Sequence, residues 1–256
     1  MRHLTSVLMM LTILSAMTMS LHSQDVVFKN NGSKALLIEL YSSEGCSSCP
    51  PAEDWIGTLK NSPGLWKDLF PVSFHVDYWD GLGWPDRFAK AAYTQRQQDY
   101  ATRLGQDSLY TPEFVMSGHE WRGWFHGERN PSAEKETSGE LTLQVKDGGK
   151  QISALYSPSS QVGSRTFTAN VALLGFNVVS DVKRGENGGR QLRHDFVVLD
   201  FESKPMTKGP HIQSGPLSLK SSTGDPPGAV VAWVSTSHGS IEQIAGGWLK
   251  PLLPPN

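Results

Sequence analysis

The 256-residue sequence has only two cysteines, no excess of charge of either sign, and no long uncharged apolar run after its N-terminus. It contains 23 Lys and Arg against 25 Asp and Glu, which gives a formal net charge of −2. Nucleic acid binding needs clustered basic residues to neutralise phosphates, so we expect no nucleic acid partner. Hydrophobic residues make up 38% of the chain and include eight Trp and ten Phe, enough to fill a sizeable core. The composition predicts a folded, mildly acidic protein of one or two domains.

Residues 1–23 predict a secretory signal peptide. Arg2 precedes an uncharged apolar run, residues 4–19, which is followed by small polar residues. Thr and Ser interrupt the run, and it is shorter than the roughly 20 apolar residues that a membrane span needs, so we expect no stable membrane span. An uncleaved N-terminal anchor is the alternative. We expect a secreted or periplasmic protein, because export leads to an oxidising environment in which paired cysteines persist.

The first half of the chain has the pattern of an α/β unit. Residues 35–41 form a short apolar run, residues 50–60 have helical spacing, and residues 72–79 alternate as a strand does. Residues 86–104 then form the longest helical pattern, which ends at Gly105. Strand, helix, strand and helix in this order predict a parallel-type α/β domain, which we place at residues 33–138.

The second half has a different texture. A polar, turn-rich stretch at residues 129–139 is followed by short alternating segments and by no convincing helical pattern. Six or seven short strands at such spacing are typical of a β-sandwich. The expected fold is therefore an α/β domain followed by a β-rich, sandwich-like domain at residues 140–250.

Cys46 and Cys49 are the strongest functional signal. They lie between the first predicted strand and the first predicted helix, where the unpaired N–H groups and the dipole of a helix lower a thiol pKa. We expect an exposed Cys46 to attack a disulfide and Cys49 to resolve the mixed disulfide. This predicts a thiol–disulfide oxidoreductase without a cofactor. Its partners would be a disulfide- or thiol-bearing exported protein or small thiol and a redox partner that the sequence does not identify.

Three other interpretations use the same cysteines. The pair could be a permanent staple, although so small a ring contributes only about 2 kcal/mol by loop entropy. The protein could be a non-catalytic copper or zinc carrier, in which His75 and His119, for example, join two thiolates. The chain lacks a second Cys or His pair at regular spacing, so no metal ligand is assigned. It could also be a structural protein whose β-rich half binds a partner while the disulfide stays closed.

Polar and aromatic side chains surround the end of the second predicted strand. Sites form at the carboxyl ends of strands in α/β sheets. We therefore expect Trp79 to line a substrate groove beside Cys46, and Asp77 and His75 to tune proton transfer at the cysteines. The alternative is that His75 and Asp77 form a hydrogen-bonded pair that only holds the following loop.

Several blocks of sequence, in order, carry a resemblance that extends from about residue 35 to the C-terminus: LLIELY, SSEGCSSCPPAE, FHVDYWDGLGWPDRF, YTPEFVMSG, RGENGGRQLRHDFVV and VVAWV. The chain resembles a family of bacterial secreted proteins with a thioredoxin-like domain, catalogued as a domain of unknown function. The resemblance implies a thioredoxin-like fold in which Thr111 and a cis Pro112 face the dithiol and bind an extended substrate backbone. Ser47 and Ser48 between the cysteines, and Gly45 before them, depart from thioredoxins and leave the direction of electron flow open.

Overall fold

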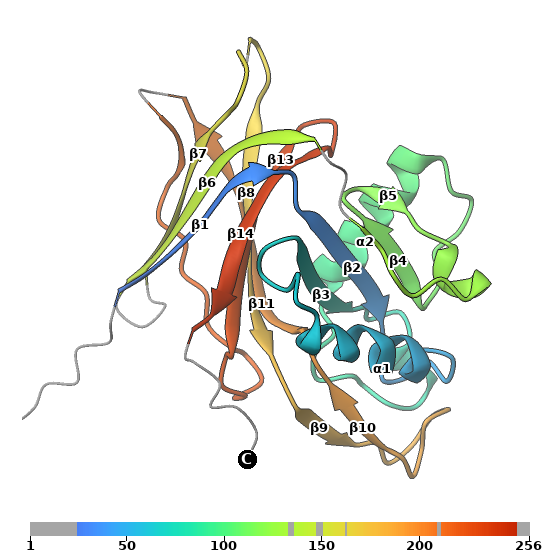
Figure 1. Ribbon diagram of the computed structural model, residues 1–256. Coiled ribbons are helices and arrows are strands. Elements are labelled where there is room, and N and C mark those ends of the chain that lie inside the picture. The colour runs from blue at the N-terminus through green and yellow to red at the C-terminus, as the bar shows by residue number, and fades with distance from the viewer. Residues whose placement is uncertain (1–24, 133–135, 147–150, 162, 209–210, 250–256) are drawn as a thin grey trace, which may run out of the picture.

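The structure is a computed structural model that describes residues 25–132, 136–146, 151–161, 163–208 and 211–249 (Figure 1). The predicted signal peptide, residues 1–23, lies outside these residues. The described part of the chain has two α-helices, α1 (Pro50–Thr58) and α2 (Ala91–Leu104). Neither helix is long and apolar enough to cross a membrane, and no other helix of the described residues is.

The same residues form fourteen strands. Their bounds are β1 (Val26–Ser33), β2 (Leu36–Ser42), β3 (Leu69–His75), β4 (Glu113–Met116), β5 (His119–Glu120), β6 (Thr137–Lys146), β7 (Gln151–Ser157), β8 (Phe167–Gly175), β9 (Val178–Asp181), β10 (Gln191–His194), β11 (Val197–Thr207), β12 (Ile212–Ser214), β13 (Ala229–Thr236) and β14 (Ile241–Trp248). Short 3₁₀ segments occur at Leu59–Asn61, Asp80–Leu82 and Gly123–His126.

The expected α/β, thioredoxin-like fold class is wrong, because the protein is mostly β with one large mixed sheet. Twelve of the described strands join in this sheet, and its longest path runs β1-β6-β7-β12-β11-β3-β2-β4-β5. The parallel pair β2 and β3 is present, but the other edge of β3 pairs with β11 from the second half of the chain. An open sheet edge needs a partner for its N–H and C=O groups, and here a distant strand supplies it.

β2 lies inside this sheet and positions the cysteines. Every residue of β2 is buried, which explains why it reads as a continuous apolar run rather than an alternating one. It pairs in parallel with β3 from Leu36↔Leu69 to Ser42↔His75 and antiparallel with β4 on its other side. α1 packs on β2 and α2 packs on β3, and Figure 1 shows α1 in front of these strands and α2 behind them.

β8 and β13 form a layer shared by two hydrophobic cores. Ala172 and Leu174 of β8 point into a core that they share with β2, β3 and α1. Their neighbours Val171 and Leu173 point into a second core, formed with β6 and β7. Side chains alternate between the faces of a strand, so this layer is covered by apolar residues on both sides. The two halves of the sequence therefore share their interior.

The hairpin β9–β10 is separate from the large sheet. Its strands pair antiparallel from Gln191↔Asp181 to His194↔Val178 and belong to no other sheet of the described residues. β10 contacts α1, and the hairpin lies beneath α1 in Figure 1. A loop of the β-rich half is thereby brought to the N-terminus of the helix that carries the cysteines.

Candidate functional site

Cys46 and Cys49 form a disulfide in the turn between β2 and α1, with their Cα atoms 5.5 Å apart. Both residues are fully buried, whereas the sequence analysis expects an exposed Cys46. Ser47 and Ser48 between them are exposed. The turn therefore reaches the surface, but its two sulfur atoms are covered.

The loop between β9 and β10 is hydrogen-bonded to the turn that holds the disulfide. Nδ2 of Asn187 donates hydrogen bonds to the carbonyl oxygens of Glu44 and Cys46, each at 2.9 Å. Oε2 of Glu186 accepts a hydrogen bond from the backbone N–H of Ser47 at 3.0 Å. Asn187 is itself fully buried. A segment about 140 positions away along the chain thus fixes the backbone on both sides of Cys46.

Trp79 and Thr111 border the disulfide on another side. Nε1 of Trp79 donates a hydrogen bond to Oγ1 of Thr111 at 2.9 Å, and the carbonyl oxygen of Thr111 lies 3.8 Å from Sγ of Cys46. The peptide bond between Thr111 and Pro112 is cis, as the resemblance implies. Gly45 lies against Trp79 so closely that an added Cβ would be 2.9 Å from the Cβ of Trp79. The structure therefore places Thr111 against Cys46, and Trp79 against Thr111 and Gly45.

The N-terminus of α1 lacks the unpaired N–H groups that were expected to stabilise a cysteine thiolate. Pro50 and Pro51 occupy its first two positions and have no N–H group. The amides of the next two residues, Ala52 and Glu53, both donate to the carbonyl oxygen of Cys49. The helix dipole still favours an anion here, but the first turn offers a cysteine thiolate no unpaired N–H.

A buried cluster of histidines and carboxylates joins the segments that flank the disulfide. Its members are Glu44, Glu53 of α1, His75 of β3, Asp86 and His194 of β10, and each is less than one-tenth exposed. Nδ1 of His75 lies 2.6 Å from Oδ2 of Asp86, and its Nε2 lies 3.4 Å from Oε1 of Glu53. Nε2 of His194 lies 3.1 Å from Oε1 of Glu44, and its Nδ1 contacts Oε2 of Glu53. Glu53 is therefore the carboxylate that both imidazoles share.

The carboxylates outweigh burial in setting the charge of these imidazoles. Burial alone would lower the pKa of His194, but Glu53 and Glu44 raise it to about 10. Burial opposes protonation of His75 too, yet Asp86 and Glu53 raise its pKa above the ordinary value. Burial would raise the pKa of Glu53, but His194 and His75 lower it. Without another cation, the carboxylates therefore favour the protonated form of both imidazoles.

Asp77 has a different environment from His75. Oγ1 of Thr94 donates a hydrogen bond to Oδ1 of Asp77 at 2.6 Å and accepts one from its backbone N–H at 3.0 Å, which ties the loop after β3 to α2. The carboxylate beside His75 is that of Asp86. The role of Asp77 and His75 in tuning the cysteines stays a prediction.

Glu53, Asp86, His194 and Asn187 are not among the site residues expected from the sequence. His194 carried a usable signal, because a polar residue beside an apolar run such as FVVL is paired when the strand is buried. Asn187 lies in a glycine-rich stretch that indicates only a turn. Its contact with Cys46 depends on how the hairpin β9–β10 is placed.

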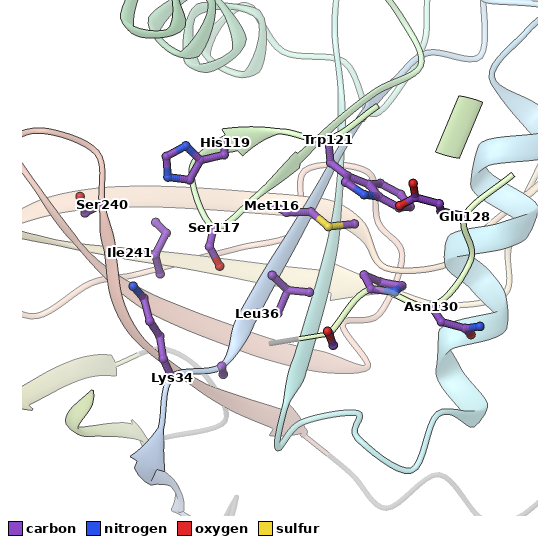
Figure 2. Close-up of a pocket in the computed structure, with 13 residues that line it drawn as sticks. Lys34, Leu36, Met116, Ser117, His119, Trp121, Glu128, Asn130, Ser240 and Ile241 are labelled. Atoms are coloured by element: carbon purple, nitrogen blue, oxygen red, sulfur yellow. The ribbon is translucent and has the colours of Figure 1, made fainter. Parts of the chain in front are cut away.

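A cavity of about 490 Å³ is lined by Lys34, Ser117, His119, Trp121 and Ile241, among others (Figure 2). None of the residues that border the disulfide lines it. His119, which the sequence analysis named with His75 as a ligand for a metal held by the cysteines, is an exposed residue of β5 here. The structure therefore places His119 and His75 in different environments.

Fold and site define a mostly β protein in which a hairpin loop of the second half is hydrogen-bonded to the turn that holds a closely spaced disulfide of the first. The chain belongs to the family described as Protein of unknown function (DUF1223), whose family model matches residues 37–235. Membership agrees with the resemblance to a family of unknown function, and the thioredoxin-like part of that resemblance is not confirmed.

Two solved structures are similar to this chain. Protein AGR_C_4864 from Agrobacterium tumefaciens is 21% identical with a TM-score of 0.58, and the match covers 88% of this chain and 98% of that chain. HBP35 of Porphyromonas gingivalis is 15% identical with a TM-score of 0.58, and the match covers 89% of this chain and 80% of that chain. At these identities the similarity concerns the fold alone. No curated protein matches the sequence.

Proposed function

We propose that the protein is an exported thiol–disulfide oxidoreductase that acts through Cys46 and Cys49. The observation that carries the proposal is the closed Cys46–Cys49 disulfide at the start of α1, with the carbonyl of Thr111 3.8 Å from Sγ of Cys46. We assign Trp79, Thr111 and Pro112 to the surface that receives a substrate backbone, because Thr111 contacts Cys46, Trp79 is bonded to Thr111, and Pro112 follows Thr111 through the cis bond.

Stability alone gives a weak reason for this disulfide. A ring closed by cysteines three positions apart restricts the unfolded chain little, by about 2 kcal/mol. The turn is also held by the hydrogen bonds of Asn187 to Glu44 and Cys46, which do not depend on the sulfur atoms. A bond that adds little stability to an already fixed turn is better explained by chemistry.

The proposed reaction exchanges one disulfide for another. In the reduced protein, the Cys46 thiolate attacks one sulfur of a substrate disulfide and releases the other sulfur as a thiolate. The Cys49 thiolate then attacks Sγ of Cys46, which forms the Cys46–Cys49 bond and releases the second substrate thiolate. Two electrons pass from the protein to the substrate. The reverse sequence oxidises a substrate dithiol.

Attack at Cys46 requires the cover over it to open. The hydrogen bonds of Glu186 and Asn187 are the contacts that hold the loop between β9 and β10 over the turn. Net hydrogen bond energies of about 1 kcal/mol each permit local opening without global unfolding. We therefore expect the loop to control how fast substrates reach Cys46.

Export is part of the proposal, because an oxidising environment keeps such a pair available for exchange. The expected partners are a disulfide- or thiol-bearing exported protein or a small thiol, together with a separate redox partner that resets the dithiol. No contact in the described residues favours the alternative in which the cysteines themselves carry copper or zinc.

The decisive measurement is the reduction potential of the Cys46–Cys49 pair, from alkylation and intact mass in graded thiol buffers. A value between about −120 and −270 mV is expected. A potential near −120 mV would mark a disulfide donor, and one near −270 mV would mark a reductant. Resistance to reduction below about −300 mV would leave a structural staple and overturn the proposal.

Trapping identifies the attacking sulfur. Cys49→Ser should accumulate a mixed disulfide between Cys46 and a model disulfide peptide, because no second thiol can resolve it. Cys46→Ser is the matched control and should accumulate none. Equal adducts in both variants would contradict the assignment of Cys46 as the nucleophile.

A further inference from the structure

The buried cluster contains an imidazole nitrogen that has no hydrogen bond partner among the described residues. Nδ1 of His75 is paired with Asp86, while its Nε2 is buried and has no hydrogen bond partner. That Nε2 atom faces Oε1 of Glu53 at 3.4 Å. A buried polar atom without a partner is costly unless a further group satisfies it.

His194 repeats this arrangement from the opposite side. Its Nε2 is paired with the carboxylate of Glu44, and its Nδ1 is directed at Glu53. Each imidazole therefore has one nitrogen held by an outer carboxylate and the other directed at the shared Glu53. This is the pattern of metal-binding histidines, whose second nitrogen donates to a carboxylate that fixes the ring and its tautomer.

From this geometry we propose that Glu53, His75 and His194 bind one divalent transition-metal ion. One potential ligand atom from each of these residues lies within 4.8 Å of the others. Metal–ligand bonds of about 2.0 to 2.2 Å bring ligand atoms to roughly 3 to 3.5 Å of one another, so small side-chain movements suffice. Asp86 and Glu44 then serve as the outer carboxylates of the site.

The charge of the cluster is compatible with this ion. Glu44, Glu53 and Asp86 contribute three buried carboxylates. A divalent cation between these side chains offsets part of this negative charge. Both imidazoles then keep one N–H for their outer carboxylates.

The donor set indicates which ions fit. Two imidazole nitrogens and one carboxylate suit Zn²⁺ and other first-row transition ions, whereas Ca²⁺ and Mg²⁺ prefer oxygen ligands alone. The position of the site also links three separate elements of the fold. Its ligands come from α1, β3 and β10, so the ion joins the helix that follows the cysteines to the hairpin that covers them.

An opening to the surface leads toward these ligands. Glu53 and His194 line a cleft of about 150 Å³ together with Ser43, Pro50 and residues of β10. A hydrated ion can therefore approach two of the three ligands from solvent. His75 lies on the buried side, where its Nε2 completes the set.

The test is equilibrium dialysis of Zn²⁺ against the chelator-stripped, full-length protein with its disulfide kept oxidised. A closed disulfide offers no thiolate, so any tight site in this form is independent of the cysteines. We expect one Zn²⁺ per chain, and the same in the double variant Cys46→Ser, Cys49→Ser. Substoichiometric binding to the oxidised protein would overturn the proposal, while leaving the redox assignment untouched.

Variants locate the ion. His75→Gln and His194→Gln should each weaken Zn²⁺ binding by more than roughly 100-fold, and Asp86→Asn by about 10- to 100-fold. His119→Gln changes an exposed histidine outside the cluster and should bind as the wild type does. Undiminished binding by folded His75→Gln and His194→Gln would place the ion elsewhere and refute the assignment.

A second measurement uses the wild-type protein, so it does not depend on whether a variant folds. In wild-type protein labelled with ¹⁵N at its histidine rings, Zn²⁺ should shift the signals of two histidines strongly and leave the exposed ones unchanged. Co²⁺ in place of Zn²⁺ should give a visible spectrum without thiolate charge-transfer bands. Uniform small shifts across all histidines would show only surface binding and would contradict the site.

Discussion

Nδ2 of Asn187 donates a 2.9 Å hydrogen bond to the backbone carbonyl of Cys46, although the two residues lie 141 positions apart. Nη1 of Arg190 donates to Oδ1 of the same amide at 2.7 Å, which fixes its orientation. Asn187 thus joins the loop between β9 and β10 to the turn that contains the disulfide. A residue that is remote in sequence therefore fixes the backbone at Cys46.

Replacing Asn187 by Ala should speed reduction of the disulfide. The change removes two hydrogen bonds that hold the loop closed, worth roughly 1 to 3 kcal/mol together, so the reduction rate by dithiothreitol should rise about tenfold or more. Gln191→Ala is the matched control, because its side chain bonds to Asp181 within the hairpin. Equal rates for Asn187→Ala and wild type would show that this loop does not limit access.

Acid should weaken the contact between the β9–β10 loop and the disulfide turn by protonating Glu186. Hydrogen bonds from the side chain and backbone N–H of Ser47 lower the pKa of the Glu186 carboxyl. A group with a lowered pKa contributes its full stabilisation above its ordinary pKa and loses it as pH falls through the lowered value. Reduction by a phosphine, which needs no thiolate, should therefore accelerate between about pH 5 and pH 3.

The variant Glu186→Gln isolates this effect. A neutral amide does not titrate, so its reduction rate should stay nearly level over the same pH range and lie above that of the wild type at neutral pH. A variant that keeps the full acid acceleration would show that another group is responsible.

Arg96 should be important for global stability. Its Nε donates to the fully buried carboxylate of Glu39 at 2.7 Å, and its guanidinium lies 5.4 and 5.2 Å from the ring centres of Phe201 and Trp233. Arg96→Ala leaves Glu39 buried without a cation, which should lower the free energy of unfolding by about 3 to 5 kcal/mol. Urea denaturation measures this.

The control for Arg96 is Arg122→Ala. Arg122 is 62% exposed and pairs with Glu120 at the surface, so its loss should cost less than about 1 kcal/mol. Similar midpoints for Arg96→Ala and wild type would argue against a stabilising role for the buried pair.

Gly45 should tolerate no side chain. A Cβ at this position would lie 2.9 Å from the Cβ of Trp79, closer than van der Waals contact allows. Gly45→Ala should therefore destabilise the fold by about 1 to 3 kcal/mol in urea denaturation. Gly81→Ala adds the same methyl group where nothing lies within 4 Å, and should leave the midpoint nearly unchanged.

Local signals in the sequence identified the elements next to the cysteines. The apolar run at residues 35–41 and the helical spacing at 50–60 correspond closely to β2 and α1, because burial and capping act over a few residues. The Cys46–Cys49 pair was evident from its spacing. The family of unknown function was also identified from the residues alone.

Local sequence patterns could not predict the fold class. The partner of β3 is β11, more than 120 positions later, and no local pattern encodes which strand fills an open edge. The surroundings of Cys46 have the same origin, because Asn187 and Thr111 reach it from other parts of the chain. Pairings at long range depend on competition among all strands, which periodicity does not contain.

The layer formed by β8 and β13 has a consequence for how the protein folds. Each face of this layer completes a different core, so neither half of the chain has a full interior of its own. A single cooperative melting transition should result, with both halves lost together. Separating the halves would leave each with an apolar face open to water, so neither half should be stable alone.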